Sequence, residues 1–304
     1  MVFFIHKIGY NSNIGGMIFM KIAFVTDSGT GKSVNELFHD GIYSVPLQVS
    51  CDNQNYQDLE ELGIEEIYKM MKEGKMLSTS LPSLGKIEEL FMELKNQGYD
   101  MIFAVPICRG LSGTLNAMEM IAKQVEIAFD YVDCHVTAIV QEYMIKLAKK
   151  MYEAGNSLEH IKEVLLEVVH STNTILLPND LQHLKRGGRL TPLAATLGGL
   201  LKIKPILKIN EQTSGKIDVQ DKVRTMHKAM DKVIDLMKED HVDDSYMITV
   251  AHADDEEEAL VYMDKIKNAF PNATHQIIKL VSVVGVHTGR GCQAVQYFKM
   301  IQDK

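Results

Sequence analysis

The sequence lacks paired cysteines. Its 4 cysteines, Cys51, Cys108, Cys134 and Cys292, stand singly, and no two of them form a C-x-x-C motif. Zinc sites and disulfide frameworks depend on regularly spaced cysteines, so this pattern speaks against both. Four buried, reduced thiols are typical of proteins in a reducing compartment. We therefore predict a cytoplasmic protein with neither a metal site nor another cofactor.

An excess of positive charge and a long hydrophobic run are also missing. The formal net charge is −8 at pH 7, whereas nucleic-acid surfaces are dominated by Lys and Arg, so no nucleic-acid partner is expected. The apolar stretch Val2–Ile5 is too short to span a bilayer, and it lacks the layout of a signal peptide. Because the first clean strand pattern begins at Lys21, we expect residues 1–20 to be an extension outside the core.

Two motifs of enzymes are incomplete. Thr26–Ser33 follows the first strand pattern and is similar to a phosphate-binding loop, but Thr26 stands where that motif requires glycine. We expect Asp27 and Ser28 to cap the following helix and to organise a cleft between domains. The segment around Ser112 does not complete the nucleophile elbow of serine hydrolases, Gly-x-Ser-x-Gly, because Thr114 stands where its last glycine is required. The sequence therefore favours a protein that holds a ligand and is not itself an enzyme.

Strand and helix patterns alternate in the first half of the chain. With 304 residues, of which 46% are hydrophobic, one large or two medium domains are expected. The alternation predicts an N-terminal α/β domain, residues 21–165, with a mostly parallel sheet and helices on both faces. The predicted strands are Ile22–Thr26, Tyr43–Val49, Met101–Pro106 and Tyr131–Thr137, and the predicted helices are Ile64–Glu73, Leu84–Gln97, Asn116–Ile127 and Ile139–Ala154.

The second half shows a hairpin. Ile203–Asn210 and Lys216–Val219 flank the turn residues Glu211–Gly215, which indicates antiparallel pairing. We predict a C-terminal mixed α/β domain, residues 166–304, that joins the first near Ser157–Ser171. Its other predicted strands are Thr174–Leu177, Tyr246–Ala251 and Gln276–Val281, and its predicted helices are Thr191–Leu200, Lys222–Asp240 and Asp254–Phe270.

Three distant segments offer groups that bind a small anion. They are Ser78–Ser83, Gly110–Thr114 and Val286–Gly289. In the first two, Thr79 and Ser112 precede helical patterns. Simple N-capping would explain these hydroxyls, but two helix starts after neighbouring parallel strands would also face one crevice. We expect the glycines of the second segment, Gly110 and Gly113, to admit a ligand close to the backbone.

The third segment and a basic loop add further candidates. His287, followed by Thr288, could donate a hydrogen bond to a carboxylate, although a single histidine can equally be a core residue. Lys185–Leu190 contains two adjacent glycines and Arg189, which could attract an anion. The alternative for this loop is a helix C-cap, where basic residues suit the helix dipole.

Six motifs, in this order, resemble those of the DegV proteins. These are the bacterial fatty-acid-binding proteins, called FakB where they serve a fatty acid kinase. The resemblance covers Lys21 to the C-terminus, and its motifs are Val25–Ser28, Thr79–Ser83, Gly110–Thr114, Leu184–Arg189, Lys204–Leu207 and Gly285–Gly289.

The resemblance implies that one long-chain fatty acid is bound between two α/β domains. It implies that Thr79, Ser112 and His287 hold the carboxylate. A partner, the fatty acid kinase catalytic subunit, would bind ATP and phosphorylate that carboxylate, and transient membrane contact would allow lipid exchange. By the same resemblance, residues near the head group or the partner interface are Arg189, Thr26, Asp27, Ser28, Gly113 and Thr288.

Two alternatives stay open at this point. The fold of the family is similar to domains of dihydroxyacetone-type kinases, so the chain could be a substrate-binding subunit of a small-molecule kinase. It could also be a regulatory protein that responds to fatty acids. The sequence departs from the family at Arg109, where a serine is usual, and at Arg290, where proline is common. We expect these two arginines to add positive potential at the entrance of the site.

Overall fold

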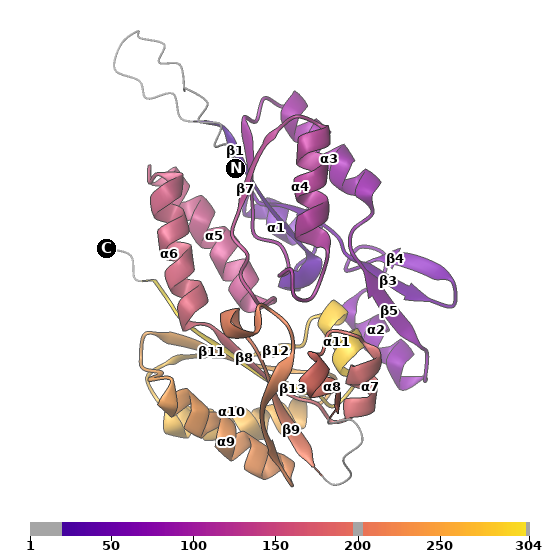
Figure 1. Cartoon of the computed structure of the whole chain (residues 1–304), viewed down its shortest axis with the longest axis vertical. Coiled ribbons are helices and arrows are strands. Elements are labelled where there is room, and N and C mark those ends of the chain that lie inside the picture. Colours follow the sequence, from indigo (N-terminus) through magenta and orange to yellow (C-terminus); the bar gives the residue numbers. More distant parts are fainter. Residues whose placement is uncertain (1–19, 197–202, 302–304) are drawn as a thin grey trace.

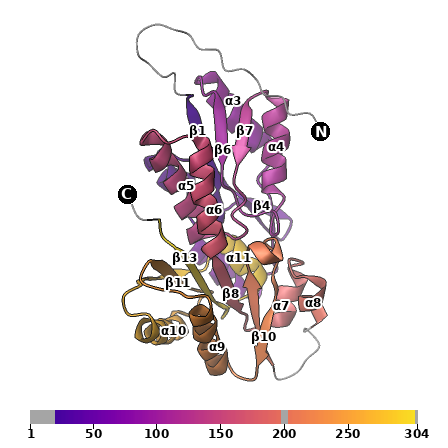
Figure 2. The same ribbon diagram turned by 60° about the vertical axis from the view of Figure 1, so that its left-hand side comes forward.

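The protein is described here by a computed structural model that covers residues 20–196 and 203–301. Figures 1 and 2 show two sheet-containing bodies stacked along the long axis, with helices around and between them. We call residues 20–157 the N-terminal half and residues 172–301 the C-terminal half. The expected extension, residues 1–20, lies outside the described part of the chain except for Met20.

The main sheet of the N-terminal half is parallel. Its strand order is β2-β1-β6-β7. All of β1 is buried, as is typical of a central parallel strand. Alternate residues of β1 enter two clusters: Ala23 and Val25 pack with α3 and α4, and Phe24 packs with α5. The elements are β1 (Ile22–Asp27), β2 (Tyr43–Val45), β6 (Met101–Ala104), β7 (Ala128–Tyr131), α1 (Val34–His39), α3 (Leu84–Asn96), α4 (Thr114–Gln124) and α5 (Ile139–Glu153).

A small antiparallel sheet, which the sequence did not predict, lies beside the parallel one. It consists of β3 (Gln48–Cys51), β4 (Gln54–Gln57) and β5 (Leu77–Ser80), and α2 (Ile64–Lys72) precedes β5. The predicted single strand Tyr43–Val49 is therefore wrong, because β2 and β3 belong to different sheets. Pro46 separates them, and proline has no N–H with which to continue a ladder.

The predicted strand Tyr131–Thr137 is also wrong beyond its first residue, since β7 ends at Tyr131. The Asp133 carboxylate accepts a hydrogen bond from the backbone N–H of His135 at 3.0 Å. His135 has a φ of 54° and Ala138 a φ of 61°, which no strand residue adopts. A side chain that bonds its own backbone in this way favours a turn over a strand.

The C-terminal half holds a mixed sheet of six strands, in the order β10-β9-β8-β13-β11-β12. Only the β11–β12 pair is parallel within it. The mixed α/β class predicted for this half is confirmed. The strands are β8 (Asn173–Leu177), β9 (Lys204–Ile209), β10 (Asp218–Val223), β11 (Tyr246–His252), β12 (Thr274–Lys279) and β13 (Gln293–Lys299).

Two long helices, α9 (Met226–Glu239) and α10 (Glu256–Ala269), pack on one face of this sheet, where Val295 and Tyr297 of β13 enter their cluster. The predicted helix Lys222–Asp240 starts too early, because residues 222 and 223 still belong to β10. Two short helices, α7 (Leu181–Arg186) and α8 (Pro192–Thr196), follow β8; the rest of the predicted helix Thr191–Leu200 lies outside the described residues.

Helices α5 and α6 (Leu158–Ser171) lie between the two sheets (Figures 1 and 2). The segment Ser157–Ser171, where we expected two domains to join, is thus a packed helix. Ile161 and Leu165 of α6 are fully buried in a cluster that also contains Phe24 of β1 and Phe298 of β13. The two halves therefore share one hydrophobic core.

Candidate functional site

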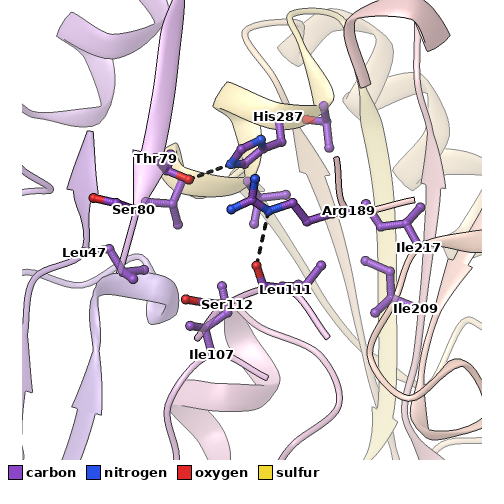
Figure 3. A pocket seen from close by; sticks show the side chains of 13 residues that line it. Leu47, Thr79, Ser80, Ile107, Leu111, Ser112, Arg189, Ile209, Ile217 and His287 are labelled. Carbon is purple, nitrogen blue, oxygen red and sulfur yellow. Dashed lines mark hydrogen bonds between the residues drawn. The ribbon is translucent and has the colours of Figure 1, made fainter. Parts of the chain in front are cut away.

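A cavity of about 40 Å³ lies where the two halves meet (Figure 3). Apolar side chains form most of its wall, and hydroxyls, an imidazole and a guanidinium gather at one part of it. The N-terminal half contributes Leu47, Thr79, Ser80, Ile107, Leu111 and Ser112, and the C-terminal half contributes Arg189, Ile209, Ile217, Val283, Val284, His287 and Thr288.

One short helix, α11 (Ser282–Thr288), supplies a whole side of the cavity. His287 lies in the last turn of this helix, which was not predicted from the sequence. Gly289, with a φ of 82°, ends the helix, and its N–H bonds to the carbonyl of Gly285. A glycine in the left-handed region is a common helix stop.

Thr79 and His287 meet in the cavity. The Thr79 Oγ1 atom lies 2.6 Å from His287 Nε2, although 208 residues separate the two in sequence. Thr79 belongs to the strand β5. Its hydroxyl therefore pairs with the imidazole across the two halves and does not cap a helix. The structure thus brings together two of the three residues assigned to a carboxylate.

His287 is neutral at neutral pH. Burial, followed by the positive charges of Arg189 and His183, lowers its pKa from 6.5 to about 4. The neighbouring His183 places Nε2 2.8 Å from the carbonyl oxygen of Val286, which fixes that ring against α11. A neutral imidazole with a hydroxyl partner can still donate one hydrogen bond, but it brings no positive charge of its own.

Ser112 also lines the cavity, just before α4. Its Oγ lies 2.8 Å from Thr114 Oγ1 and accepts a hydrogen bond from the Thr114 N–H at 3.3 Å. The Ser112 hydroxyl thus lines the cavity and also bonds the first N–H of α4. The structure contradicts the expectation for Gly110, and that for Gly113 stays a prediction. A Cβ on Gly113 would meet only Leu81 Cδ2 at 3.7 Å, whereas Gly110 is pressed against the backbone of Gly215 and not against the cavity.

Arg189 supplies a cation within the cavity. Its Nη1 donates to the carbonyl of Gly187 at 2.7 Å, and its Nε donates to that of Leu111 at 3.3 Å. The second bond joins the two halves, as Figure 3 shows. Burial lowers the pKa of this guanidinium, but arginine remains charged at any physiological pH. A half-buried cation without a carboxylate partner in the cavity lining attracts an anion into this space.

Thr26, Asp27 and Ser28 stand one layer behind the cavity. The Asp27 carboxylate accepts hydrogen bonds from the N–H groups of Ile107 at 2.9 Å and Gly29 at 2.8 Å. The Thr26 hydroxyl donates to the carbonyl of Val105 at 2.7 Å. Asp27 caps only the short 3-10 turn Ser28–Thr30, because Ser33 caps α1. This layer holds wall residues in place, and burial raises the pKa of Asp27 to about 6.

The two arginines that depart from the family pattern are engaged elsewhere. Arg109 forms an ion pair with Glu119, Nη2 to Oε2 2.6 Å, and lies over the ring of Tyr131. Arg290 forms one with Asp254, Nη2 to Oδ2 2.9 Å. Neither lines the cavity. The structure therefore gives each of these charges a local partner, and their effect at an entrance remains a prediction.

One buried polar residue was missed by the sequence reasoning. Asp58 is fully buried, and its carboxylate accepts hydrogen bonds from the Ser28 hydroxyl at 2.6 Å and from the Ser282 hydroxyl. Its neighbours Glu60 and Glu61 give the segment the appearance of a solvated acidic run. No local motif marks it. The apolar lining residues were missed as well, although Ile107 follows the carboxyl end of β6, where ligands bind in parallel sheets.

Within residues 20–196 and 203–301, no cluster of three or more His, Cys, Asp or Glu residues is arranged to hold a metal ion. Over the same ranges, no helix has both the length and the apolar character needed to cross a membrane.

Comparison with known proteins gives the family. A family model described as "Uncharacterised protein, DegV family" matches residues 21–300. This chain belongs to the DegV family. A DegV domain-containing protein of Streptococcus pneumoniae is 30% identical over 284 residues, which is 93% of this chain and 100% of the relative. The resemblance carried by the six motifs is thereby confirmed.

Solved structures agree with the fold. DegV of Bacillus subtilis, described as a fatty acid binding protein, superposes with a TM-score of 0.80 at 28% identity, over 93% of this chain and 100% of the other. A fatty acid binding DegV family protein of Streptococcus agalactiae gives 0.84 at 26% identity, over 93% and 100%. The predicted α/β class, with a parallel sheet in the N-terminal half and a mixed one in the C-terminal half, is confirmed.

Proposed function

We propose that this DegV protein binds one long-chain fatty acid between its two halves and holds the carboxylate at Thr79, Ser112 and His287. The proposal rests on one cavity in which these groups share a space with an apolar wall. Relatives of the same fold from Bacillus subtilis and Streptococcus agalactiae are described as fatty acid binding proteins, which supports it.

The polar groups suit a carboxylate in number and charge. The Thr79–His287 bond uses one of the two protons of this pair, so the pair can donate one hydrogen bond to a carboxylate oxygen. The Ser112 hydroxyl can donate a second, and Arg189 compensates the negative charge. Each bond to a charged group is worth about 1.5–3 kcal/mol. We infer that these groups fix the orientation of the head and contribute less to affinity than the tail does.

The tail accounts for most of the affinity. Burying about fourteen CH₂ groups contributes roughly 11 kcal/mol before the costs of binding. The cavity of about 40 Å³ is far below the range of about 300–1,000 Å³ that is common for small-molecule sites, so its walls have to part around an acyl chain. We call the boundary between the two halves at this cavity the seam. Apolar residues of both halves line it, and separating them would open a path between the halves.

We further propose that the chain is a non-catalytic carrier in the cytoplasm, which collects its ligand by transient contact with a membrane. A fatty acid kinase catalytic subunit would supply ATP. A carboxylate oxygen of the bound acid would attack the γ-phosphorus, and ADP would leave, which yields an acyl phosphate. The incomplete phosphate-binding motif at Thr26–Ser33 supports placing the nucleotide on the partner.

Native mass spectrometry of the purified protein, followed by lipid extraction, tests the proposal. One fatty acid per chain is expected, either co-purified or after incubation with palmitate or oleate. Thr79→Ala should weaken binding modestly and lower acyl phosphate formation by an added fatty acid kinase more strongly. Ser78→Ala, an exposed neighbour on β5, is the matched control. A mass that stays that of the free protein with both acids would overturn the proposal.

A further inference from the structure

The helix that carries His287 docks on the opposite half of the molecule. Helix α11 connects β12 with β13, so it belongs to the C-terminal half by sequence. Yet Tyr68 of α2 donates a hydrogen bond to the carbonyl of Leu280, just before α11, at 2.8 Å. A Cβ on Gly285 would lie 2.1 Å from the Tyr68 hydroxyl oxygen. The backbone of α11 therefore packs directly on α2.

A buried carboxylate fastens the first residue of this helix. Asp58 accepts a hydrogen bond from Ser28, in the loop after β1, at 2.6 Å, and one from Ser282, where α11 begins. The Ser28 hydroxyl also accepts from the N–H of Leu47, a wall residue of the cavity, at 3.0 Å. One side chain thus joins the cavity wall of the N-terminal half to the start of α11.

Helix geometry relates this anchor to the cavity. Successive residues turn by about 100°, so Ser282, Gly285 and Val286 share one side of α11, while Val283, Val284 and His287 share the other. The first group contains the residues in contact with Asp58 and Tyr68, and the second lines the cavity. Ser282 and His287 are about 140° apart around the axis and about 7.5 Å apart along it.

We propose that Asp58 is a positioning residue for His287: by holding Ser282, it fixes the rotation and height of α11 that aim the imidazole at Thr79 and at the bound carboxylate. The inference rests on the proposed function and adds a residue outside the cavity to its binding site. Tyr68 holds Leu280 just before this helix of 7 residues and His183 holds the carbonyl of Val286, and Asp58 adds the contact to the side chain of its first residue.

The chemistry of the anchor suits this role. Both serine hydroxyls can donate only if Asp58 offers two acceptor oxygens, which an ionised carboxylate does. Burial raises the pKa of Asp58 to about 6, against the hydrogen bonds of Ser28 and Ser282, which lower it; the charges of Asp27 and Glu60 add to the rise. At pH 7 the group is therefore mostly ionised, and charge-assisted bonds are the stronger kind.

Ser282→Ala tests the inference with a small change. In ligand-free protein, the ¹⁵N resonance of His287 Nε2 should shift or broaden when the anchor is removed. The dissociation of oleate at pH 7 should become about tenfold faster, as expected for the loss of a hydrogen bond to a charged group. Ser157→Ala, which removes a single capping hydroxyl from α6 away from the cavity, should change neither.

The same substitution in a His287→Gln variant distinguishes a role in positioning His287 from a general loss of stability. If Ser282 acts through His287, then in a His287→Gln background Ser282→Ala should change oleate dissociation by less than about twofold, because coupled residues are not additive. A tenfold effect in both backgrounds, or an unchanged imidazole resonance, would overturn the inference. The resonance needs no ligand, so a wild-type protein that fails to bind oleate would refute the proposed function and leave the test of Asp58 intact.

Discussion

A histidine that is kept neutral by its surroundings makes the site sensitive to acid. His287 lies beside Arg189 inside the seam, and both burial and this neighbouring charge oppose its protonation. Its hydrogen bond to Thr79 is made without a net charge on either partner. The positive potential of the site therefore comes from the Arg189 guanidinium, which does not titrate at physiological pH. In the proposed function, the neutral imidazole only orients the ligand.

The pH dependence of stability should show this directly. The pKa of His287 is about 4 in the folded protein and 6.5 when unperturbed. As pH falls from 6.5 to 4, the unfolded chain takes up a proton that the folded chain does not, so folding loses up to about 3 kcal/mol. His287→Gln removes this loss.

Urea unfolding of the wild type and of His287→Gln between pH 7 and pH 4 measures the effect. The stability of the wild type relative to the variant should fall with decreasing pH. The pKa values of Asp27 and Asp58, raised to about 6, act in the opposite direction, because the folded state binds their protons first. Both carboxylates are present in both proteins, so the effect of His287 is seen only in the difference in unfolding free energy between the wild type and the variant. A difference that does not vary with pH contradicts the assignment.

Candidate binding residues could be predicted from the sequence where they are grouped in short motifs. Thr79, Ser112 and His287 sit in short segments rich in hydroxyls and glycine, and the structure places all three on one cavity. Asp58 sits among other acidic residues and carries no such mark. Its significance comes from partners 30 and 224 residues away, which local sequence cannot reveal.

At the scale of elements, α11 shows how tertiary contacts override local preference. Its sequence, Ser-Val-Val-Gly-Val-His-Thr, is rich in β-branched residues and contains glycine, which disfavour a helix. The helix forms because Ser282 is anchored, Gly285 lets α2 approach, and two of its three valines are buried. A sequence pattern reports the local preference alone, so this helix was not predicted.

Gly285→Ala should therefore disturb this element. The new methyl group would lie 2.1 Å from the hydroxyl oxygen of Tyr68 and 2.7 Å from its ring, so α11 has to move away from α2. Overpacking of this kind costs about 1–3 kcal/mol, and faster release of fatty acid should accompany it. Thermal unfolding measures the loss of stability, and the rate of oleate dissociation measures the faster release.

Gly85→Ala in α3 is the matched control. Its nearest neighbour would be Ser83 Oγ at 3.8 Å, which is an ordinary contact. Alanine is the better helix former, so the melting temperature should stay the same or rise slightly. If both variants melt alike and release oleate at the same rate, then close packing of α2 on Gly285 is not what holds α11.

The strands that sequence missed have physical reasons too. β13 lies in the middle of the second sheet, but Gln293 and Gln296 interrupt its apolar pattern. Both are buried, and Gln296 is satisfied by Thr137 and Thr174 at 3.0 and 2.8 Å. Long, regularly patterned elements such as α3, α5 and α10 were predicted nearly to the residue, because their own amphipathic period specifies them.

At the scale of the whole molecule, the two halves behave as one packed body. Phe24 and Phe298 come from different sheets and share one core with α5 and α6. At a second junction the loop after β6 meets the β9–β10 hairpin: Gly110 packs against the backbone of Gly215, and the Cys108 thiol donates to the Gly215 carbonyl at 3.6 Å. A ligand that enters through the seam therefore has to separate residues at both junctions. Substitutions at the glycine contact test whether it holds the two halves together.

Gly110→Ala should weaken the junction between the halves. Its Cβ would lie 2.2 Å from the carbonyl carbon of Gly215 and 2.5 Å from the carbonyl oxygen of Ser214, and backbone atoms cannot rotate out of the way. We expect the free energy of unfolding to fall by about 1–3 kcal/mol or more. Urea unfolding followed by far-ultraviolet circular dichroism measures this in a chain that has no tryptophan.

Gly113→Ala, three residues further along, isolates the cause. There a Cβ meets only Leu81 Cδ2 at 3.7 Å, and the backbone φ of −79° suits any residue, so stability should change by no more than about 0.5 kcal/mol. Equal losses of stability in the two variants would mean that neither glycine of the loop after β6 can be replaced, whatever its contacts. A loss of stability in the Gly110 variant alone would show that the halves are held together where Gly110 meets the turn of the β9–β10 hairpin. Oleate should then leave Gly110→Ala faster than Gly113→Ala, because the same junction closes the seam over the acyl chain.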